Sequence, residues 1–306
     1  MSLGILCIAG VVVLWGSIAI LVKVILRTID PFTLAFLRLF QGTAVLVLLF
    51  RLQGGSLRGL LWKSRWIWVG AGGACINFVF YALSLHHTTA SSAVLIVQVQ
   101  FVLFVILTGV YLRERVSLLK ICCMGVTICG VVWVVWSPAS TSGAIPPTTL
   151  GNLLMLLGAG GWAVYALANK ALSRQAHSFQ VLIPMLGLSA MAVGAFAFGR
   201  LALVGFESRL PISLSAVGAV LLLGIVCTGG SFYLQFEAFK RLSSATAGTM
   251  TSVSPLLSIL LARWLLGEGQ SRSILLASGL IVIGIVGIVQ AERTESKRVQ
   301  RRRATH

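Results

Sequence analysis

Apolar stretches of about 20 residues recur along the chain, and they constrain its fold more than any other feature. A helix of that length spans the roughly 30 Å of hydrocarbon in a bilayer. It also satisfies its own backbone groups in lipid, whereas a membrane β-barrel would show short alternating segments. The sequence therefore predicts an all-α integral membrane protein. Ten transmembrane helices are expected, at residues 3–26, 31–50, 66–86, 90–112, 117–136, 150–171, 179–199, 213–238, 245–266 and 273–291.

The charges of the chain fit a membrane location. The 306 residues are 58% hydrophobic and only 10% charged, too few charges to cover the surface of a soluble domain. The net charge of +17 is concentrated in alternate loops and in the tail KRVQRRR. Placing both termini in the cytoplasm puts most of the Lys and Arg residues inside, as the positive-inside rule requires. We therefore expect a multi-pass protein of the cell inner membrane with cytoplasmic termini, whose basicity reports topology and contact with the lipid bilayer, with no nucleic-acid partner.

The two halves of the chain carry the same pattern of residues. Shifts of 154 and 147 residues align the ends and the beginnings of the two halves without gaps. The matched pairs include Glu114 with Glu268, Gly125 with Gly279, Gly130 with Gly284, and Trp15 with Trp162. The predicted organisation is a five-helix repeat at 1–136, a linker at 137–149, a second five-helix repeat at 150–291, and a basic cytoplasmic tail at 292–306.

An odd number of helices in each repeat has a consequence for topology. The second copy must enter the membrane inverted relative to the first. Two inverted repeats with a binding site between them, near the midplane of the membrane, are the architecture of secondary transporters. The duplication therefore favours transport of a small-molecule substrate.

Several stretches resemble the EamA family of the drug/metabolite transporter superfamily, over nearly the full length of the chain. They are LWGSIAILVK, PFTLAFLR, TTASSAVLIVQ and YLRERVSLLKICCMGVTICG in the first half, and GWAVYALANK and LSSATAGTMTSVSPLLSILLARWLLGEGQS in the second. The resemblance implies ten helices, cytoplasmic termini, and export of amino acids, related metabolites or drugs by alternating access. It fixes neither the substrate nor the energy source.

Charged residues next to or inside the spans are candidates for function. Arg38 lies within the second span, where a charge costs roughly 2.5–3.5 kcal/mol on insertion scales and so faces protein or a wet cavity. It either attracts a substrate carboxylate or makes a structural bond to backbone carbonyls or to a neighbouring helix, and both interpretations stay open. Glu114 and Glu268 follow the fourth and ninth spans, where each is expected to cap the next helix near its positive dipole end.

Polar and aromatic residues predict the substrate path. Asn77, Tyr81 and Ser84 recur on one face of the third span, and a polar stripe on a transmembrane helix must face inward. The other residues predicted on the path are Trp15, Trp162 and Tyr165 as aromatic surface, Tyr233 in the eighth span, and Ser252 just before Pro255 in the ninth.

Two amides, Gln98 and Gln100, lie inside the apolar fourth span. In a helix, residues two apart point about 200° from each other, so the two side chains are expected to have separate roles. We predict that Gln98 faces the path and that Gln100 bonds to a neighbouring helix. Pro255 aligns with Phe101 in the first half, which argues against a symmetric break in the fourth and ninth helices.

The sequence lacks the motifs of an enzyme. It contains neither H-E-x-x-H nor G-x-S-x-G, and the adjacent His86 and His87 point too far apart to ligate one metal. We expect no catalytic residues, metal or cofactor.

The predicted function is a secondary transporter that exports small metabolites, with amino acids or related compounds as the expected class. Uptake, a broad drug or metabolite permease, and a non-transporting membrane protein are the alternatives, and the oligomeric state, a monomer included, stays open.

Overall fold

All regular elements in the described residues of the computed structural model are helices; these residues are 2–113, 117–136, 148–173, 176–204, 214–235, 254–268 and 272–304. The helices are α1 (Ser2–Ile25), α2 (Pro31–Leu52), α3 (Arg65–His87), α4 (Ala90–Ile96), α5 (Val99–Tyr111), α6 (Leu118–Trp136), α7 (Thr149–Ser173), α8 (Ser178–Val204), α9 (Leu214–Leu221), α12 (Ser254–Leu266) and α13 (Arg272–Ala304). A short 3₁₀ turn lies at Leu57–Gly59, and a π-helical segment, η2 (Leu222–Gly230), continues α9.

The prediction of a membrane-spanning helical protein is supported by the lengths of these helices. Within the described ranges, eight spans are long and apolar enough to cross a membrane, and Ser254–Leu266 and Arg272–Ile288 are two shorter apolar helices. The ninth predicted span begins at 245, and its first part lies outside the described residues. The predicted linker at 137–149 is also described only at its end.

Local signals place the helix ends close to the expected positions. Asp30 caps α2 because its carboxylate accepts hydrogen bonds from the backbone amides of Phe32 (3.0 Å) and Thr33 (3.2 Å). Pro31 is the first residue of that helix, where its missing N–H costs nothing. Gly267, with φ of 66°, follows the end of α12, a conformation that favours glycine.

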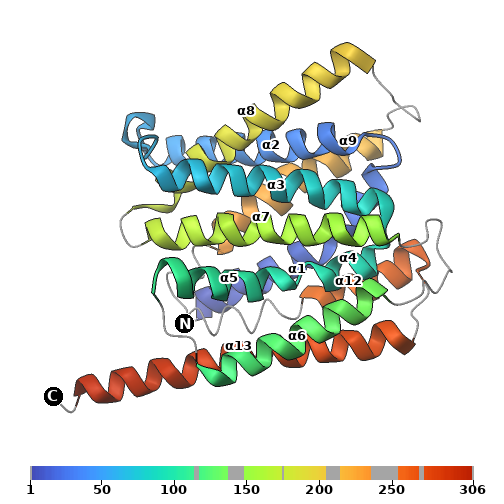
Figure 1. Ribbon diagram of the computed structural model, residues 1–306. Coiled ribbons are helices and arrows are strands. Elements are labelled where there is room, and N and C mark those ends of the chain that lie inside the picture. The colour runs from blue at the N-terminus through green and yellow to red at the C-terminus, as the bar shows by residue number, and fades with distance from the viewer. Residues whose placement is uncertain are drawn as a thin grey trace.

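The long helices run side by side in one bundle, and both chain termini lie at the same end of it (Figure 1). One cluster of buried apolar residues joins α1, α4, α6, α12 and α13, and a second joins α2, α3, α7 and α8. Helix α13 continues as a single helix through the predicted basic tail and projects beyond the bundle (Figure 1).

Helices α3 and α7 approach each other closely through glycines. A Cβ atom on Gly73 would lie 2.7 Å from the carbonyl oxygen of Gly161, and a Cβ on Gly161 would lie 2.6 Å from the amide nitrogen of Asn77. The Asn77 side chain uses this proximity to donate a hydrogen bond to the carbonyl of Gly158 (2.9 Å). Small residues allow such backbone contact between membrane helices, so the two halves of the chain are held together here.

The crossing of α6 and α13 uses a second pair of glycines (Figure 1). A Cβ on Gly130 would lie 2.7 Å from Cγ1 of Ile281 and 3.0 Å from the carbonyl oxygen of Ala277. A Cβ on Gly284 would lie 2.8 Å from both the carbonyl oxygen of Cys123 and the amide nitrogen of Thr127. Each glycine of the matched pair therefore lies against the backbone of the other helix.

The fourth span differs from the expected continuous helix, because it is interrupted between α4 and α5 at Val97 and Gln98. Around this interruption the backbone N–H groups of Gln98, Gln100 and Phe101 donate to the backbone carbonyls three residues earlier instead of four. The carbonyl of Val94 is bonded instead by the side-chain amide of Gln98, at 3.0 Å. The first half thus breaks its helix without proline, by tightening one turn and replacing a backbone donor with a side chain.

Glu268 caps a different helix from the one predicted. Its buried carboxylate accepts hydrogen bonds from the backbone amides of Ala90 (2.7 Å) and Ser91 (2.9 Å) at the start of α4, not from α13. Lys23 of α1 pairs with the same carboxylate at 3.8 Å and donates to the carbonyl of Thr88. Glu268 is a structural cap, as predicted, but the helix that it caps is α4 and not the next helix, α13. Glu114, its match in the first half, lies outside the described residues.

Candidate functional site

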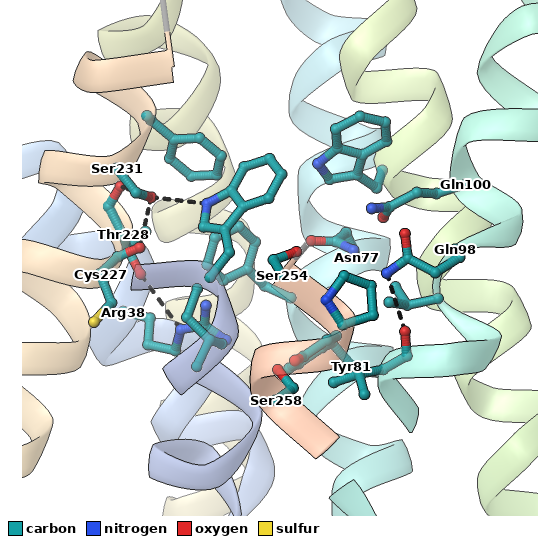
Figure 2. Close-up of a pocket in the computed structure, with 18 of the residues that line it drawn as sticks. Arg38, Asn77, Tyr81, Gln98, Gln100, Cys227, Thr228, Ser231, Ser254 and Ser258 are labelled. Atoms are coloured by element: carbon teal, nitrogen blue, oxygen red, sulfur yellow. Dashed lines mark hydrogen bonds between the residues drawn. The ribbon is translucent and has the colours of Figure 1, made fainter. Parts of the chain in front are cut away.

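A cavity of about 100 Å³ lies between helices of both halves, and it has room for several water molecules or one small solute. Its walls come from α1, α2, α3, α4, α5, α7, η2 and α12, and Figure 2 shows many of the side chains. The lining is mainly aromatic and apolar with a few polar groups, as in most small-molecule sites. The polar lining residues are Arg38, Asn77, Tyr81, Gln98, Gln100, Thr228, Ser231, Ser254 and Ser258.

Arg38 is the only positive charge among the lining residues in the described part of the chain, and it is 5% exposed. Its Nε donates to Oγ1 of Thr228 at 3.4 Å, and its guanidinium carbon lies 4.7 Å from the ring centre of Phe78 and 5.8 Å from that of Tyr81. Among the described residues no carboxylate forms an ion pair with it. Aromatic faces stabilise the cation without neutralising it, so the charge remains available to an anionic group.

The π-helical turn η2 brings Thr228 to Arg38. The hydroxyl of Thr228 donates to the carbonyl of Leu223, five residues back, at 2.9 Å, which leaves its oxygen lone pairs facing Arg38. π-Helical insertions within α-helices are frequent at functional sites. Glycines at 224 and 229 allow η2 to pack closely against α2, where Gly229 faces the carbonyl of Gly42.

Hydroxyl groups join the cavity walls to one another. Trp15 donates through Nε1 to Oγ of Ser231 at 3.1 Å, and Ser231 donates in turn to the carbonyl of Cys227 at 2.6 Å (Figure 2). Ser258 of α12 donates to the carbonyl of Gly16 of α1 at 2.6 Å. These bonds fix the aromatic and hydroxyl groups of the wall in position, which favours a preformed binding site.

Trp162 forms the centre of an aromatic wall. Its ring lies 5.4 Å from Phe101, 6.3 Å from Phe104 and 6.4 Å from Trp15, all at steep angles. Edge-to-face contacts of this kind are the preferred geometry for aromatic pairs. The matched tryptophans of the two halves therefore meet at the cavity.

Six of the ten residues predicted on the substrate path line this cavity. They are Trp15, Arg38, Asn77, Tyr81, Gln98 and Trp162. They come from both halves, and the packing of α3 and α5 against α7, and of α2 and α1 against α3, brings them together.

Three of the remaining predicted residues lie outside the lining. Ser84 is fully buried, nearer the C-terminal end of α3 than the stripe that lines the cavity. Tyr165 packs against Phe232, with ring centres 5.7 Å apart, and Tyr233 stacks on Phe179 at 5.4 Å. The two tyrosines are packing residues, because their rings lie against aromatic rings of other helices. Ser252 lies outside the described residues.

Gln100 also lines the cavity, contrary to the prediction that it bonds to a neighbouring helix. The interruption of the fourth span explains the difference. In a tightened 3₁₀ turn, residues two apart are rotated by about 240°, which separates them by about 120° the short way round. In an α-helix the rotation is about 200°, which separates them by about 160°. Gln98 and Gln100 therefore both reach one wall (Figure 2).

Sequence reasoning missed Thr228 and Ser258 in the lining. Each is a single hydroxyl within an apolar helix, where the common role is a bond to the backbone of its own helix. No pattern in the sequence distinguishes such a hydroxyl from one that faces a cavity.

Among the described residues, no group of three or more His, Cys, Asp and Glu side chains could hold a metal ion.

A sequence model of the EamA-like transporter family matches residues 2–136 and again residues 149–290. The chain belongs to the EamA-like transporter family. Similar proteins include an uncharacterized transporter of Archaeoglobus fulgidus, 25% identical over 86% of this chain and 89% of its own length. The uncharacterized transporter YetK of Bacillus subtilis is 23% identical over 85% of this chain and 79% of its own.

A solved crystal structure shares the fold of this EamA-like transporter. It is 22% identical, with a TM-score of 0.68 over 95% of this chain and 98% of that one. Family and relatives together identify a multi-pass membrane transporter for small molecules and not an enzyme. The cavity between the helices is the candidate substrate site.

Proposed function

We propose that this transporter exports small metabolites, amino acids or related compounds, across the cell inner membrane. It works by alternating access between two inverted five-helix repeats, 1–136 and 150–291, with both termini in the cytoplasm. The observation that carries the substrate class is Arg38, a buried cation that lines the cavity without a carboxylate partner among the described residues. A substrate carboxylate supplies the missing counter-charge.

The rest of the cavity suits the other parts of an amino acid. Hydroxyl and amide groups offer hydrogen bonds to an ammonium group, and Trp15, Trp162 and Phe101 offer apolar surface to a side chain. An ammonium group also interacts favourably with aromatic faces. The carboxylate of such a solute pairs directly with the charge of Arg38.

The inverted arrangement is supported by the crossing of α6 and α13. Under the shift of 154 residues, Ala277 and Ile281 correspond to Cys123 and Thr127. Gly130 contacts Ala277 and Ile281, and Gly284 contacts Cys123 and Thr127. The shift that matches the two glycines therefore also matches the residues that they contact. Reciprocal contacts of this kind are expected where a twofold axis relates two units.

The test is the efflux of labelled amino acids from a bacterium that lacks its own exporters, repeated in vesicles that contain the purified protein. Arg38→Met should lower the transport rate about tenfold or more, because a hydrogen bond to a charged group contributes roughly 1.5–3 kcal/mol. Arg38→Lys keeps the charge but not the planar donor geometry. Its transport rate should lie between those of Arg38→Met and the wild type.

Arg51→Met is the matched control, since Arg51 is an exposed arginine on the same helix and does not line the cavity. It should transport at the wild-type rate. Measuring label in both directions, with and without a protonophore, separates export from uptake and coupled from uncoupled transport. The proposal is overturned if the folded wild-type protein moves no amino acid in either direction.

A further inference from the structure

The side-chain amide of Gln98 is held in one orientation. Its Nε2 donates to the carbonyl of Val94 at 3.0 Å, in the position that the backbone amide of Gln98 vacates by bonding to Leu95. A donor fixed on one side of the planar amide places the acceptor on the other side. The carboxamide oxygen is therefore oriented by the interruption between α4 and α5.

That oxygen has no hydrogen-bond partner. Gln98 is only 4% exposed, and Oε1 is among the few buried polar atoms of the described residues that lack one. Gln100 lines the same wall, yet it does not donate to this oxygen. Buried polar groups are normally paired, so an unpaired acceptor in the wall of a binding cavity indicates a group that a ligand satisfies.

Gln98 and Arg38 lie on opposite sides of the cavity (Figure 2). Arg38 comes from α2, beside η2, whereas Gln98 comes from the junction of α4 and α5, with Ser254 and Ser258 of α12 between them in the view. One end of the cavity thus offers a cationic donor, and the other offers a neutral acceptor. A solute that satisfies both carries its carboxylate and a hydrogen-bond donor at opposite ends.

We infer that Gln98 determines specificity by accepting a hydrogen bond from a nitrogen group at the end of the substrate remote from its carboxylate. This inference rests on the proposed function, because it takes the carboxylate to lie at Arg38. The favoured substrates are amino acids with an amine or amide at the end of the side chain. Amino acids with apolar side chains leave the oxygen of Gln98 unpaired and bind less well.

Ornithine and norvaline provide the matched pair of probes, since they differ by the terminal amine of the side chain alone. The measurement is the ratio of their initial transport rates in vesicles with the purified protein. The wild-type protein should favour ornithine, and Gln98→Met, which removes the acceptor, should lower the ratio about tenfold. Gln98→Glu keeps an acceptor oxygen and adds a negative charge, so it should raise the ratio above the wild-type value.

Gln41→Met is the matched control. Gln41 also has an unpaired buried carboxamide oxygen, but it packs against Gly224 and does not line the cavity. This variant should keep the wild-type ratio. If Gln98→Met fails to reach the membrane, the transport ratio of Gln98→Glu tests the role of Gln98.

The outcomes separate this inference from the function on which it rests. If the wild-type protein transports neither these probes nor other amino acids, the proposed function fails. If it transports them without preference, or if substitutions of Gln98 leave the ratio unchanged, the role of Gln98 is overturned and amino-acid transport stands. A lower ratio in Gln98→Met with a wild-type ratio in Gln41→Met supports the inference.

Discussion

Glu268 illustrates how a single buried carboxylate joins three helices. It extends from the end of α12, caps the first turn of α4, and pairs with Lys23 of α1. Ser91 adds a third hydrogen bond to the carboxylate through its hydroxyl, at 2.7 Å. The charge is stable in this buried place because every interaction is with a donor or with the positive end of a helix.

Glu268→Gln should destabilise the protein by about 1–3 kcal/mol, since an amide NH₂ group in place of one oxygen would face backbone donors of α4. Thermal unfolding of the purified variant in detergent measures this effect. Ser91→Ala removes one donor and leaves the backbone cap intact, so its effect should be smaller. Equal stability of Glu268→Gln and the wild type would show that the cap contributes nothing.

At the scale of elements, the packing of α3 on α7 depends on which glycine faces the partner helix. Gly73 and Gly161 lie against backbone atoms of the other helix, whereas a Cβ on the adjacent Gly72 or Gly160 would meet nothing within 4 Å. The asparagine bond to Gly158 requires the same close approach. Contact at this distance brings Asn77 and Tyr81 of α3 to the same cavity as Trp162 of α7.

Gly73→Ala and Gly161→Ala should each lower the free energy of unfolding by about 1–3 kcal/mol, because the added methyl group forces the helices apart. Gly72→Ala and Gly160→Ala should be neutral or stabilising by up to about 1 kcal/mol, since alanine favours a helix. Thermal unfolding of the four purified variants in detergent makes the comparison. Similar values within each adjacent pair would contradict the backbone contact.

At the scale of the whole molecule, the proposed inverted repeat has a measurable consequence. Gly130 and Gly284 make reciprocal contacts at the crossing of α6 and α13, while Gly125 and Gly279 face open space. The first pair and the second pair are each matched by the same shift of 154 residues. If the two repeats are related by symmetry, the same substitution at both members of a pair should change the stability of the protein by a similar amount.

Gly130→Ala and Gly284→Ala should therefore destabilise the protein by similar amounts, about 1–3 kcal/mol each, through the same loss of close packing. Gly125→Ala and Gly279→Ala should both have little effect. The checks are thermal unfolding in detergent and the amount of each variant in the membrane. A large penalty at one member of a pair and none at the other would argue against the reciprocal interface.

The sequence by itself determined that this is a helical membrane protein, where most helices begin and end, and which family it resembles. The helices follow from segment length, apolar content and local caps such as Asp30, which act within one element, whereas the resemblance rests on the order of motifs along the chain. Arg38 and Trp15 could also be identified, because a charge or a large ring within a span requires a partner.

Only the tertiary structure decided which of these residues meet. It placed Gln98 and Gln100 on one wall by tightening the turn around Val97 and Gln98. It turned Tyr165 and Tyr233 into packing residues and brought Thr228 to Arg38. A helix presents several faces, and its own sequence does not state which neighbour covers each one. That choice depends on contacts between residues far apart in the chain.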